Sequence, residues 1–427
     1  MLRYCLVLLA GAVGAAEAPL LEASLRSLVD QDREVRAPVA APATETTTNQ
    51  PPEWFGSGLA WTEWSRASGN WSGIRTWLEN RGFNFGGNYS FDSSFPIAGD
   101  AAHGGIARGL LELNLEFDPE SLLGWKGGRF FVQSLFFHGH NGAEVVGDLQ
   151  GFSNIDAERF NKLEEFWYEQ KMAGEILRLK IGQVDANGEF AWVAAAGDFL
   201  CPSAGYSPSI FTLPTYPNAR LSVNLFVTPG DRLYAGAGLY GPELGNSLSS
   251  SHPFWIGEIG VQRAATARAG AGRLAFGVWH ETTTVGRFDG GNRNGSTGLF
   301  SVGEQRVWRE HPDDKADRQG ATIFYQYGWA DRQVSAVTQH VSVGARWQGA
   351  VRGRDDDALG FRFSWVETSR AAGSGYNADE TNWESFYLFQ ATPFLALIPD
   401  LQWIHNPGGE AARPNALIFT LRATIEF

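Results

Sequence analysis

Apolar and polar residues alternate along most of this chain with a period of two. The clearest stretch is 107–118, where one face carries Ala107, Gly109, Leu111, Leu113, Leu115 and Phe117, and the other carries Arg108, Leu110, Glu112, Asn114, Glu116 and Asp118. Only Leu110 departs from the polarity of its face. The last segment, 417–427, repeats the alternation. Such a pattern predicts β-strands with one apolar face and one polar face.

Shorter runs of the same kind predict many further strands. They lie at 83–95, 129–138, 163–172, 177–181, 220–227, 232–240, 254–263, 273–281, 321–329, 334–347, 358–366, 383–391 and 395–405. At roughly 20–25 residues for each strand and its connection, the chain has space for about 14–18 strands. Short connections such as 228–232 alternate with long polar ones such as 282–319.

Alternating strands occur both in soluble sandwiches, which bury their apolar faces, and in membrane barrels, which turn them toward lipid. The number of strands, the alternation of short and long connections, and aromatic residues near strand ends favour the barrel. These aromatic residues are Phe130, Phe131, Phe136, Phe137, Trp255, Trp308, Trp329, Trp347, Trp383 and Trp403. The sequence therefore predicts an all-β fold, a transmembrane antiparallel β-barrel preceded by a short helix and a linker.

The N-terminal part lacks the period-two pattern and divides into predicted segments. Residues 1–18 have a positive start at Arg3, a short apolar run and an A-x-A site, which is typical of a secretory signal peptide. Residues 19–53 combine a helix-like arm with a linker rich in Pro, Ala and Thr. The barrel is predicted over 54–427, with a short helix at about 71–81 that ends at Gly82.

Composition narrows the classes of function. The 427 residues carry 34 Lys and Arg against 47 Asp and Glu, a net charge of −13, which argues against nucleic acid as a partner. Charged residues make up only 19%, which suits a protein whose outer surface need not face water everywhere. Because Cys5 lies in the predicted signal peptide, Cys201 has no second cysteine for a disulfide.

The sequence contains short matches to cofactor- and metal-binding motifs, but the residues around them do not support these functions. Residues 236–241 fit G-x-G-x-x-G, but Pro242 follows them in place of a helix. His138 and His140 lack an evident third metal ligand, and the acidic run 355–357 is more often a solvated turn than a calcium loop. No H-E-x-x-H or G-x-S-x-G motif occurs. We therefore expect no enzyme activity, no cofactor and no metal site.

Four groups of residues occur in order along 70–427. They are 70–82 (Asn-Trp-Ser-Gly-Ile-Arg-Thr-Trp-Leu-Glu-Asn-Arg-Gly), 181–190 continuing through 198–200 and 216–217, the acidic loop and strand at 353–366, and a C-terminal group at 392–393, 399–404, 406–409 and the final strand with Arg422 and Phe427. Together they resemble the carbohydrate-selective porins related to the bacterial glucose porin. Asn70, Ser72 and Cys201 depart from the pattern of that family, which leaves the preferred sugar open.

The resemblance implies an outer-membrane barrel of about 16 strands, through which mono- and small oligosaccharides diffuse passively. Its partners would be outer-membrane lipid and small carbohydrates. The final strand ends in Phe427, which looks like the signature by which the barrel assembly machinery recognises such proteins. The alternatives are a nonspecific or organic-acid-selective porin of the same architecture, and a secreted Trp-rich glycoside hydrolase or lectin, although no pair of carboxylates stands out for hydrolysis.

Alternation also indicates which residues would line a polar interior. Sugars offer hydroxyl groups and C–H faces, so their channel needs charged, amide and aromatic side chains that bind weakly enough to release. Charged side chains are disfavoured on the lipid side, where an arginine at mid-depth costs roughly 2–4 kcal/mol. The candidates for the constriction are Arg108, Glu112, Glu165, Trp167, Arg178, Lys180, Arg220, Asn224, Arg362 and Arg422. The alternative interpretation of any one of them is a wall residue that is salt-bridged across strands.

Overall fold

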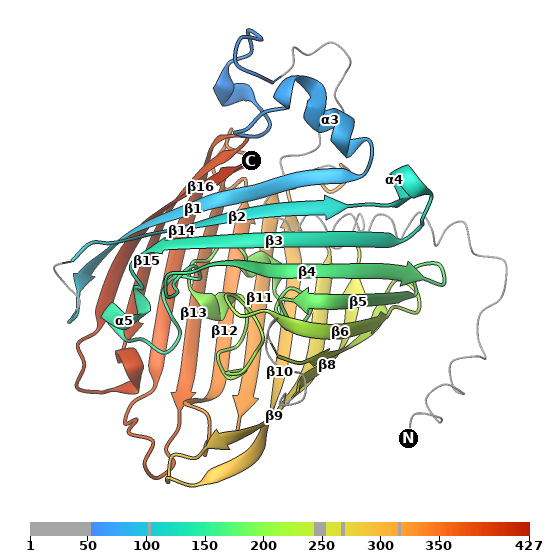
Figure 1. Ribbon diagram of the computed structural model, residues 1–427. Helices are drawn as coiled ribbons and strands as arrows, with labels where there is room; N and C mark the ends of the chain where they lie inside the picture. The colour runs from blue at the N-terminus through green and yellow to red at the C-terminus, as the bar shows by residue number, and fades with distance from the viewer. Residues whose placement is uncertain (1–52, 101–103, 243–252, 266–269, 315–316) are drawn as a thin grey trace.

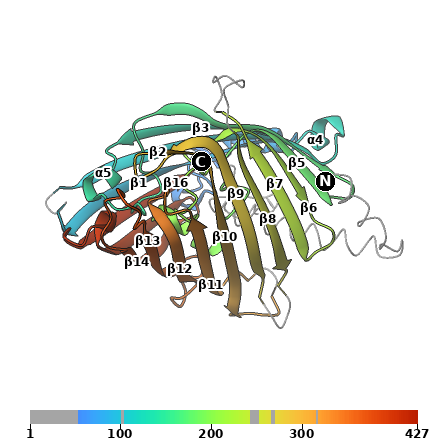
Figure 2. The ribbon, with the colours of Figure 1, turned by 90° about the horizontal axis from the view of Figure 1, so that it is seen from below.

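Sixteen antiparallel strands form a closed barrel in the computed structural model, which describes residues 53–100, 104–242, 253–265, 270–314 and 317–427 (Figure 1). Each strand pairs with its neighbours in chain order, and β1 pairs with β16 to close the ring (Figure 2). The predicted barrel and the strand number implied by the resemblance are therefore confirmed. No helix among the described residues is long and apolar enough to span a membrane. The predicted signal peptide and most of the predicted arm lie outside the described residues.

The strands have the following bounds. They are β1 (Phe83–Ala98), β2 (Ile106–Phe117), β3 (Gly128–Gly139), β4 (Asn161–Met172), β5 (Leu177–Val184), β6 (Arg220–Val227), β7 (Leu233–Tyr240), β8 (Phe254–Arg263), β9 (Gly272–Gly286), β10 (Asn292–Arg309), β11 (Gly320–Ala330), β12 (Val337–Gln348), β13 (Ala358–Thr368), β14 (Glu380–Thr392), β15 (Leu395–His405) and β16 (Ala416–Glu426). The α-helices are α3 (Ile74–Glu79), α4 (Glu120–Leu123) and α5 (Ala143–Val146). Short 3-10 turns lie at Trp61–Glu63, Trp71–Gly73, Ala194–Ala196, Pro202–Ala204 and Pro407–Gly409.

The apolar face of each strand is turned outward. Large side chains such as Leu113, Ile259 and Phe361 are exposed on the outside of the barrel, which is the arrangement of a membrane barrel and not of a sandwich. The predicted tryptophans are also exposed near strand ends; they are Trp255, Trp308, Trp329, Trp347, Trp383 and Trp403. Two of the predicted girdle residues are an exception. Phe137 is buried, and Phe131 stacks on Trp167, because both belong to the inward face of β3.

One predicted connection is wrong. The segment 282–319 was expected to be a long polar loop, but β9 continues to Gly286 and β10 occupies Asn292–Arg309. Only 287–291 and 310–319 are left as connections. The alternation is obscured there because glycines and polar residues fill β10, whereas its backbone is held on both sides by pairing with β9 and β11. Interstrand hydrogen bonding therefore decided this element against its local sequence pattern.

The two longest fully described connections fold into the barrel. They are 140–160, between β3 and β4, and 185–219, between β5 and β6, and we call them the first and second inner loops. Both start from the end of the barrel opposite the start of β1 and the end of β16. In such barrels that end is extracellular and carries the longer loops. Phe190, Phe199 and Ile210 of the second inner loop pack on apolar residues that the strands turn inward. The barrel thus has an internal apolar core as well as an apolar exterior.

Candidate functional site

Three glutamates on the barrel wall hold the second inner loop by its backbone. Glu258 on β8 accepts the Ala191 N–H at 2.9 Å, and Glu304 on β10 accepts the Ala195 N–H at 2.8 Å. Glu384 on β14 accepts the N–H groups of Leu200 and Cys201, at 2.6 and 3.0 Å. Hydrogen bonds to a charged acceptor are stronger than neutral ones. The loop is therefore attached at successive points to the wall from β8 to β14.

Basic side chains complete this attachment. Arg273 on β9 donates to the Trp192 carbonyl at 2.6 Å, and Arg346 on β12 pairs with Asp198 at 2.5 Å. Arg362 on β13 donates to Glu384 through Nε and Nη2, at 3.1 and 2.9 Å, and neither side chain has accessible surface. The buried Arg362 and Glu384 form a pair that also reaches Ser203 of the loop, through Arg362 Nη1 at 2.9 Å.

The first inner loop is held by a second charged cluster at the seam of the barrel. Asp92 on β1 accepts two hydrogen bonds from Arg422 on β16, at 2.6 and 2.9 Å, and one from Ser153 of the loop at 2.7 Å. Arg108 on β2 forms ion pairs with Asp92 at 3.6 Å and with Asp156 of the loop at 2.6 Å. Burial raises the pKa of Asp156 to about 6, and the Arg108 guanidinium opposes that rise.

The two inner loops contact each other directly. The Asn154 N–H donates to the Leu200 carbonyl at 2.6 Å, and Ser203 Oγ donates to Gln150 at 3.0 Å. Cys201 Sγ lies 2.9 Å from the Gly151 carbonyl, and burial raises the pKa of its thiol to about 12. The loops therefore form one internal unit, and Cys201, which departs from the family pattern, lies at their junction.

The part of the wall from β2 to β5 also contacts the inner loops, but several of its inward side chains keep accessible surface. Glu112 on β2, Glu165 and Trp167 on β4, and Arg178 on β5 face the interior and keep accessible surface. Asp185 of the second inner loop also keeps accessible surface, and its N–H donates to Glu165 at 2.9 Å. On β13 to β15, by contrast, most inward polar residues are completely buried, among them Arg362, Glu384 and Gln402. The accessible interior surface therefore includes the space between β2–β5 and the second inner loop.

On this accessible surface Arg178 forms ion pairs, whereas the carboxylates of Glu112 and Glu165 accept hydrogen bonds from neutral groups. Arg178 is held by Glu169 and Glu189, at 3.0 and 2.7 Å. Glu112 accepts neutral hydrogen bonds from Gln133, at 3.1 Å, and from the Asn88 side chain, and Glu165 accepts the Asp185 N–H. Burial raises the pKa of Asp185, although hydrogen bonds from Thr215 and from the backbone oppose the rise. The surface consequently presents carboxylate oxygens as hydrogen-bond acceptors, with Arg178 as the nearby donor.

Trp167 forms a rigid part of the same wall. Its ring is stacked with Phe131 at a centroid distance of 4.9 Å, and Lys180 Nζ lies 3.7 Å from the ring centroid. Lys180 is fixed in turn by Glu189 at 2.6 Å. Because Phe131 and Lys180 already contact the ring, Trp167 mainly shapes the interior surface and leaves little free ring face on which a ligand could stack.

The structure divides the ten predicted residues into two groups. Glu112, Glu165, Trp167, Arg178 and Arg220 are half-buried in the interior, and Arg220 lies 3.8 Å from Glu281. Arg108, Lys180, Asn224, Arg362 and Arg422 also turn inward but are buried. The second group therefore contacts inner loops or neighbouring strands. In the first group, Gln133 of β3 links Glu112 and Glu165, since it donates to Glu112 and lies opposite Glu165. Arg178 lies at the periplasmic start of β5 and Arg220 at the extracellular start of β6.

Sequence reasoning missed the loop residues of the site, above all Asp185 and Glu189. Their segment has no period, so no face could be assigned to it. An indirect signal did exist in Leu110, the one apolar residue on a polar face. It is buried against Leu135 and Phe137 of β3 and against Ile155 of the first inner loop. Apolar residues at inward positions thus mark where a loop covers the wall.

No group of three or more metal-ligating side chains is found in the described parts of the chain. His138, considered above as a metal ligand, is instead 2.9 Å from the Tyr89 hydroxyl. His140 is exposed at the end of β3.

Comparison with known proteins agrees with this architecture. The family model described as carbohydrate-selective porin, OprB family, matches residues 102–427. Porin B of Pseudomonas aeruginosa is 23% identical over 416 residues, which cover 84% of this chain and 90% of that protein. The structure of Pseudomonas putida OprB solved at high pH is 19% identical, covers 86% of this chain and 100% of that one, and has a TM-score of 0.78. Its low-pH structure, 18% identical with coverage of 86% and 99%, has a TM-score of 0.57.

Proposed function

Because this chain belongs to the OprB family of carbohydrate-selective porins and is an outer-membrane channel for carbohydrates, we propose that mono- and small oligosaccharides diffuse passively along the accessible interior surface of β2 to β5. The observation that carries this route is the accessible surface that Glu112, Glu165 and Arg178 keep on the inner side of β2 to β5.

The chemistry of these side chains suits a neutral sugar. Carboxylate oxygens of Glu112 and Glu165 accept hydrogen bonds from sugar hydroxyls, and Arg178 donates to sugar oxygens. A sugar exchanges its bound water for these groups and then returns to water, so that binding is weak enough to allow exit. Trp167 narrows the route and fixes its shape. Arg220 contacts sugars at the extracellular entrance.

The buried predicted residues have a different role in this proposal. Arg108, Arg362 and Arg422 hold the inner loops, and Lys180 and Asn224 stabilise the wall behind the route. Their contribution to selectivity is indirect, because they set how far the loops narrow the barrel. Transport needs no catalytic residue and no cofactor in this mechanism.

Two further partners belong to the proposal. The outward apolar faces of the strands contact outer-membrane lipid, supported by the exposed leucines and the tryptophans near strand ends. The C-terminal Phe427 serves recognition by the barrel assembly machinery. In the folded barrel its N–H donates to the Gly87 carbonyl at 3.0 Å, so that this last residue is paired into the seam.

Liposome swelling tests the proposed route. Proteoliposomes are compared in glucose, sucrose and an organic acid of the size of glucose. We expect fast swelling with glucose, slower swelling with sucrose and the slowest with the acid, because Glu112, Glu165 and Asp185 repel anions. The double variant Glu112→Gln, Glu165→Gln should lose most of the discrimination against the acid, while Glu410→Gln, on an exposed loop, should leave all three rates unchanged. Equal discrimination in the double variant would refute this route.

A further inference from the structure

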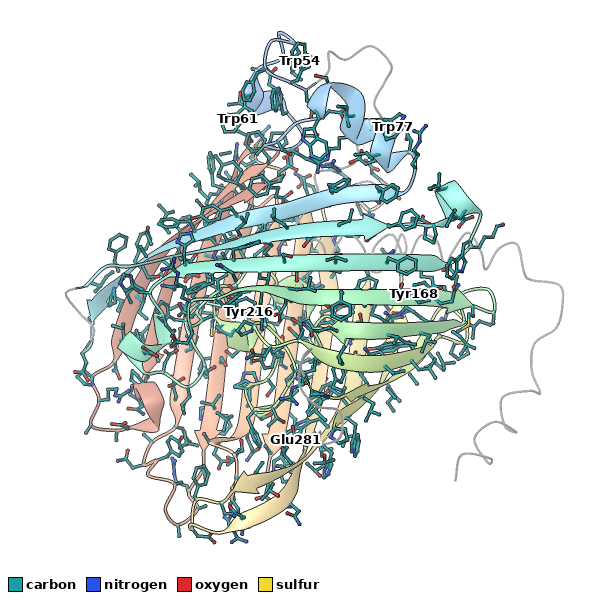
Figure 3. The ribbon with its side chains drawn as sticks, viewed as in Figure 1. Trp54, Trp61, Trp77, Tyr168, Tyr216 and Glu281 are labelled. Carbon is teal, nitrogen blue, oxygen red and sulfur yellow. The ribbon has the colours of Figure 1, made fainter. Side chains whose placement is uncertain are left out.

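The segment 53–82 packs at the end of the barrel where β1 starts and β16 ends, and we call it the cap. Arg75 of α3 is buried and donates through Nη2 to the carbonyls of Phe85 and Phe427, the latter at 2.9 Å. The Ala67 N–H donates to the Glu426 carbonyl at 2.9 Å. Figure 3 shows Trp54, Trp61 and Trp77 on this cap, beyond the ends of the strands. Because Arg75 binds both sides of the seam, α3 has a fixed orientation on the barrel.

Three large apolar side chains of the cap, Trp71, Ile74 and Trp77, are exposed at its surface. Trp71 lies just before α3, in the 3-10 turn Trp71–Gly73, where its φ is 50°, and Ile74 and Trp77 lie three residues apart on one side of α3. Their side chains are 37%, 57% and 53% exposed. Single exposed apolar residues need no explanation, but a row of three with two tryptophans marks an interaction surface.

This row continues the outer aromatic surface of the barrel. The Trp71 ring lies 5.8 Å from Phe85, which points outward from β1. Along the same end of the barrel, outward rings follow one another from Phe83 to Phe117 at 4.4 Å and from Phe130 to Tyr168 at 4.7 Å. Aromatic rings in this position lie at the boundary between lipid headgroups and acyl chains. The exposed row at α3 is therefore contiguous with a lipid-facing surface.

A cation accompanies the row on its polar side. The Arg81 guanidinium lies 4.0 Å from the centroid of the Trp77 ring, and its Nη1 donates to the Trp77 carbonyl at 3.0 Å. An arginine beside an interfacial tryptophan is placed to contact a lipid phosphate while the rings enter the acyl boundary.

We propose that α3 is a membrane-docking helix: Trp71, Ile74 and Trp77 insert into the periplasmic leaflet of the outer membrane, and Arg81 contacts phospholipid phosphate. This docking holds the cap against the leaflet beside the seam of β1 and β16. It is independent of the sugar route, because it involves only the outer side of the periplasmic end.

A fluorescent probe on α3 tests the docking. Trp77→Cys, in a Cys201→Ser background, is labelled with an environment-sensitive dye and reconstituted in phosphatidylglycerol vesicles. A matched control places the dye at Phe55→Cys, which is the most exposed aromatic position of the cap at 76%. We expect a blue-shifted emission at position 77 that lipid-borne nitroxide quenches and aqueous iodide does not, and the reverse at position 55.

Correct folding of each variant is verified by the change in gel mobility that a folded barrel shows on heating. In a folded barrel, two results would overturn the proposal. One is equal quenching by iodide at positions 77 and 55, which means that α3 is in water. The other is protection from iodide without nitroxide quenching, which means that protein covers the helix. Arg81→Gln should weaken quenching by nitroxide more in phosphatidylglycerol than in phosphatidylcholine, and an unchanged value in both lipids would remove Arg81 from the proposal. Sugar-dependent swelling of the same vesicles should be unchanged throughout.

Discussion

Replacing Glu384 by alanine should release the second inner loop from the barrel wall. The Glu384 carboxylate has no accessible surface and accepts four hydrogen bonds, two from the N–H groups of Leu200 and Cys201 and two from Arg362. Truncating one member of a buried ion pair costs about 3–5 kcal/mol. Each buried N–H group that loses its acceptor adds about 1–3 kcal/mol.

The structure indicates how this cost is relieved. The ladder between β13 and β14 does not involve the Glu384 side chain, so the barrel itself remains closed. If the loop lifts from β14, water reaches Arg362 and the two N–H groups, and most of the penalty disappears. We therefore expect local opening of the segment around Leu200 and Cys201 in a folded barrel, and not global unfolding.

Thiol chemistry and conductance measure this opening. Cys201 is buried, and its thiol has a pKa of about 12, so a maleimide should react with it very slowly in the native barrel. In Glu384→Ala we expect rapid labelling, a larger and noisier single-channel conductance, and weaker discrimination between glucose and sucrose. Asp379→Ala is the control, because its pair with Arg370 is exposed and worth at most about 1 kcal/mol. Native labelling and conductance in folded Glu384→Ala would refute the anchoring role of this carboxylate.

Three further outcomes follow from the same structure. Glu112→Gln combined with Glu165→Gln should shift the reversal potential in a salt gradient toward lower cation preference, and an unchanged potential would place the ion path elsewhere. Because the pKa of Asp156 is raised from 3.8 to about 6, the folded barrel binds more protons than the unfolded chain between these values. Its contribution to stability is therefore present at low pH and lost as pH rises through about 6, and Asp156→Asn should remove that part of the pH dependence of unfolding. Current fluctuations should also decrease below this pH, because the closed loop, in which the pKa of Asp156 is raised, binds the proton more tightly than an opened loop; a flat pH profile would contradict the assignment. Leu299→Arg on the lipid face should destabilise the barrel by roughly 2–4 kcal/mol in urea unfolding, and native stability would contradict the outward orientation of that position.

The sequence by itself determined which face of each strand meets lipid. Alternation is a local property, since successive side chains of a strand point to opposite sides whatever the rest of the chain does. Leu113 and Glu112 were therefore assigned to opposite faces of β2, and the tryptophans near strand ends to the membrane boundary. The approximate number of strands followed from the length of the chain and the barrel from the number of strands, their connections and the family resemblance, while β10 was hidden because glycines and polar residues interrupt the alternation.

Only the tertiary structure decided which inward residues remain accessible. Arg108 and Glu112 lie on the same face of β2, four residues apart, and the sequence gives no reason to separate them. The first inner loop covers Arg108 through Asp156, whereas Glu112 keeps accessible surface. The second inner loop reaches Glu384 from Leu200, a contact between residues 184 apart. Such contacts depend on closing the barrel first, because only closure brings β14 within reach of a loop that begins after β5.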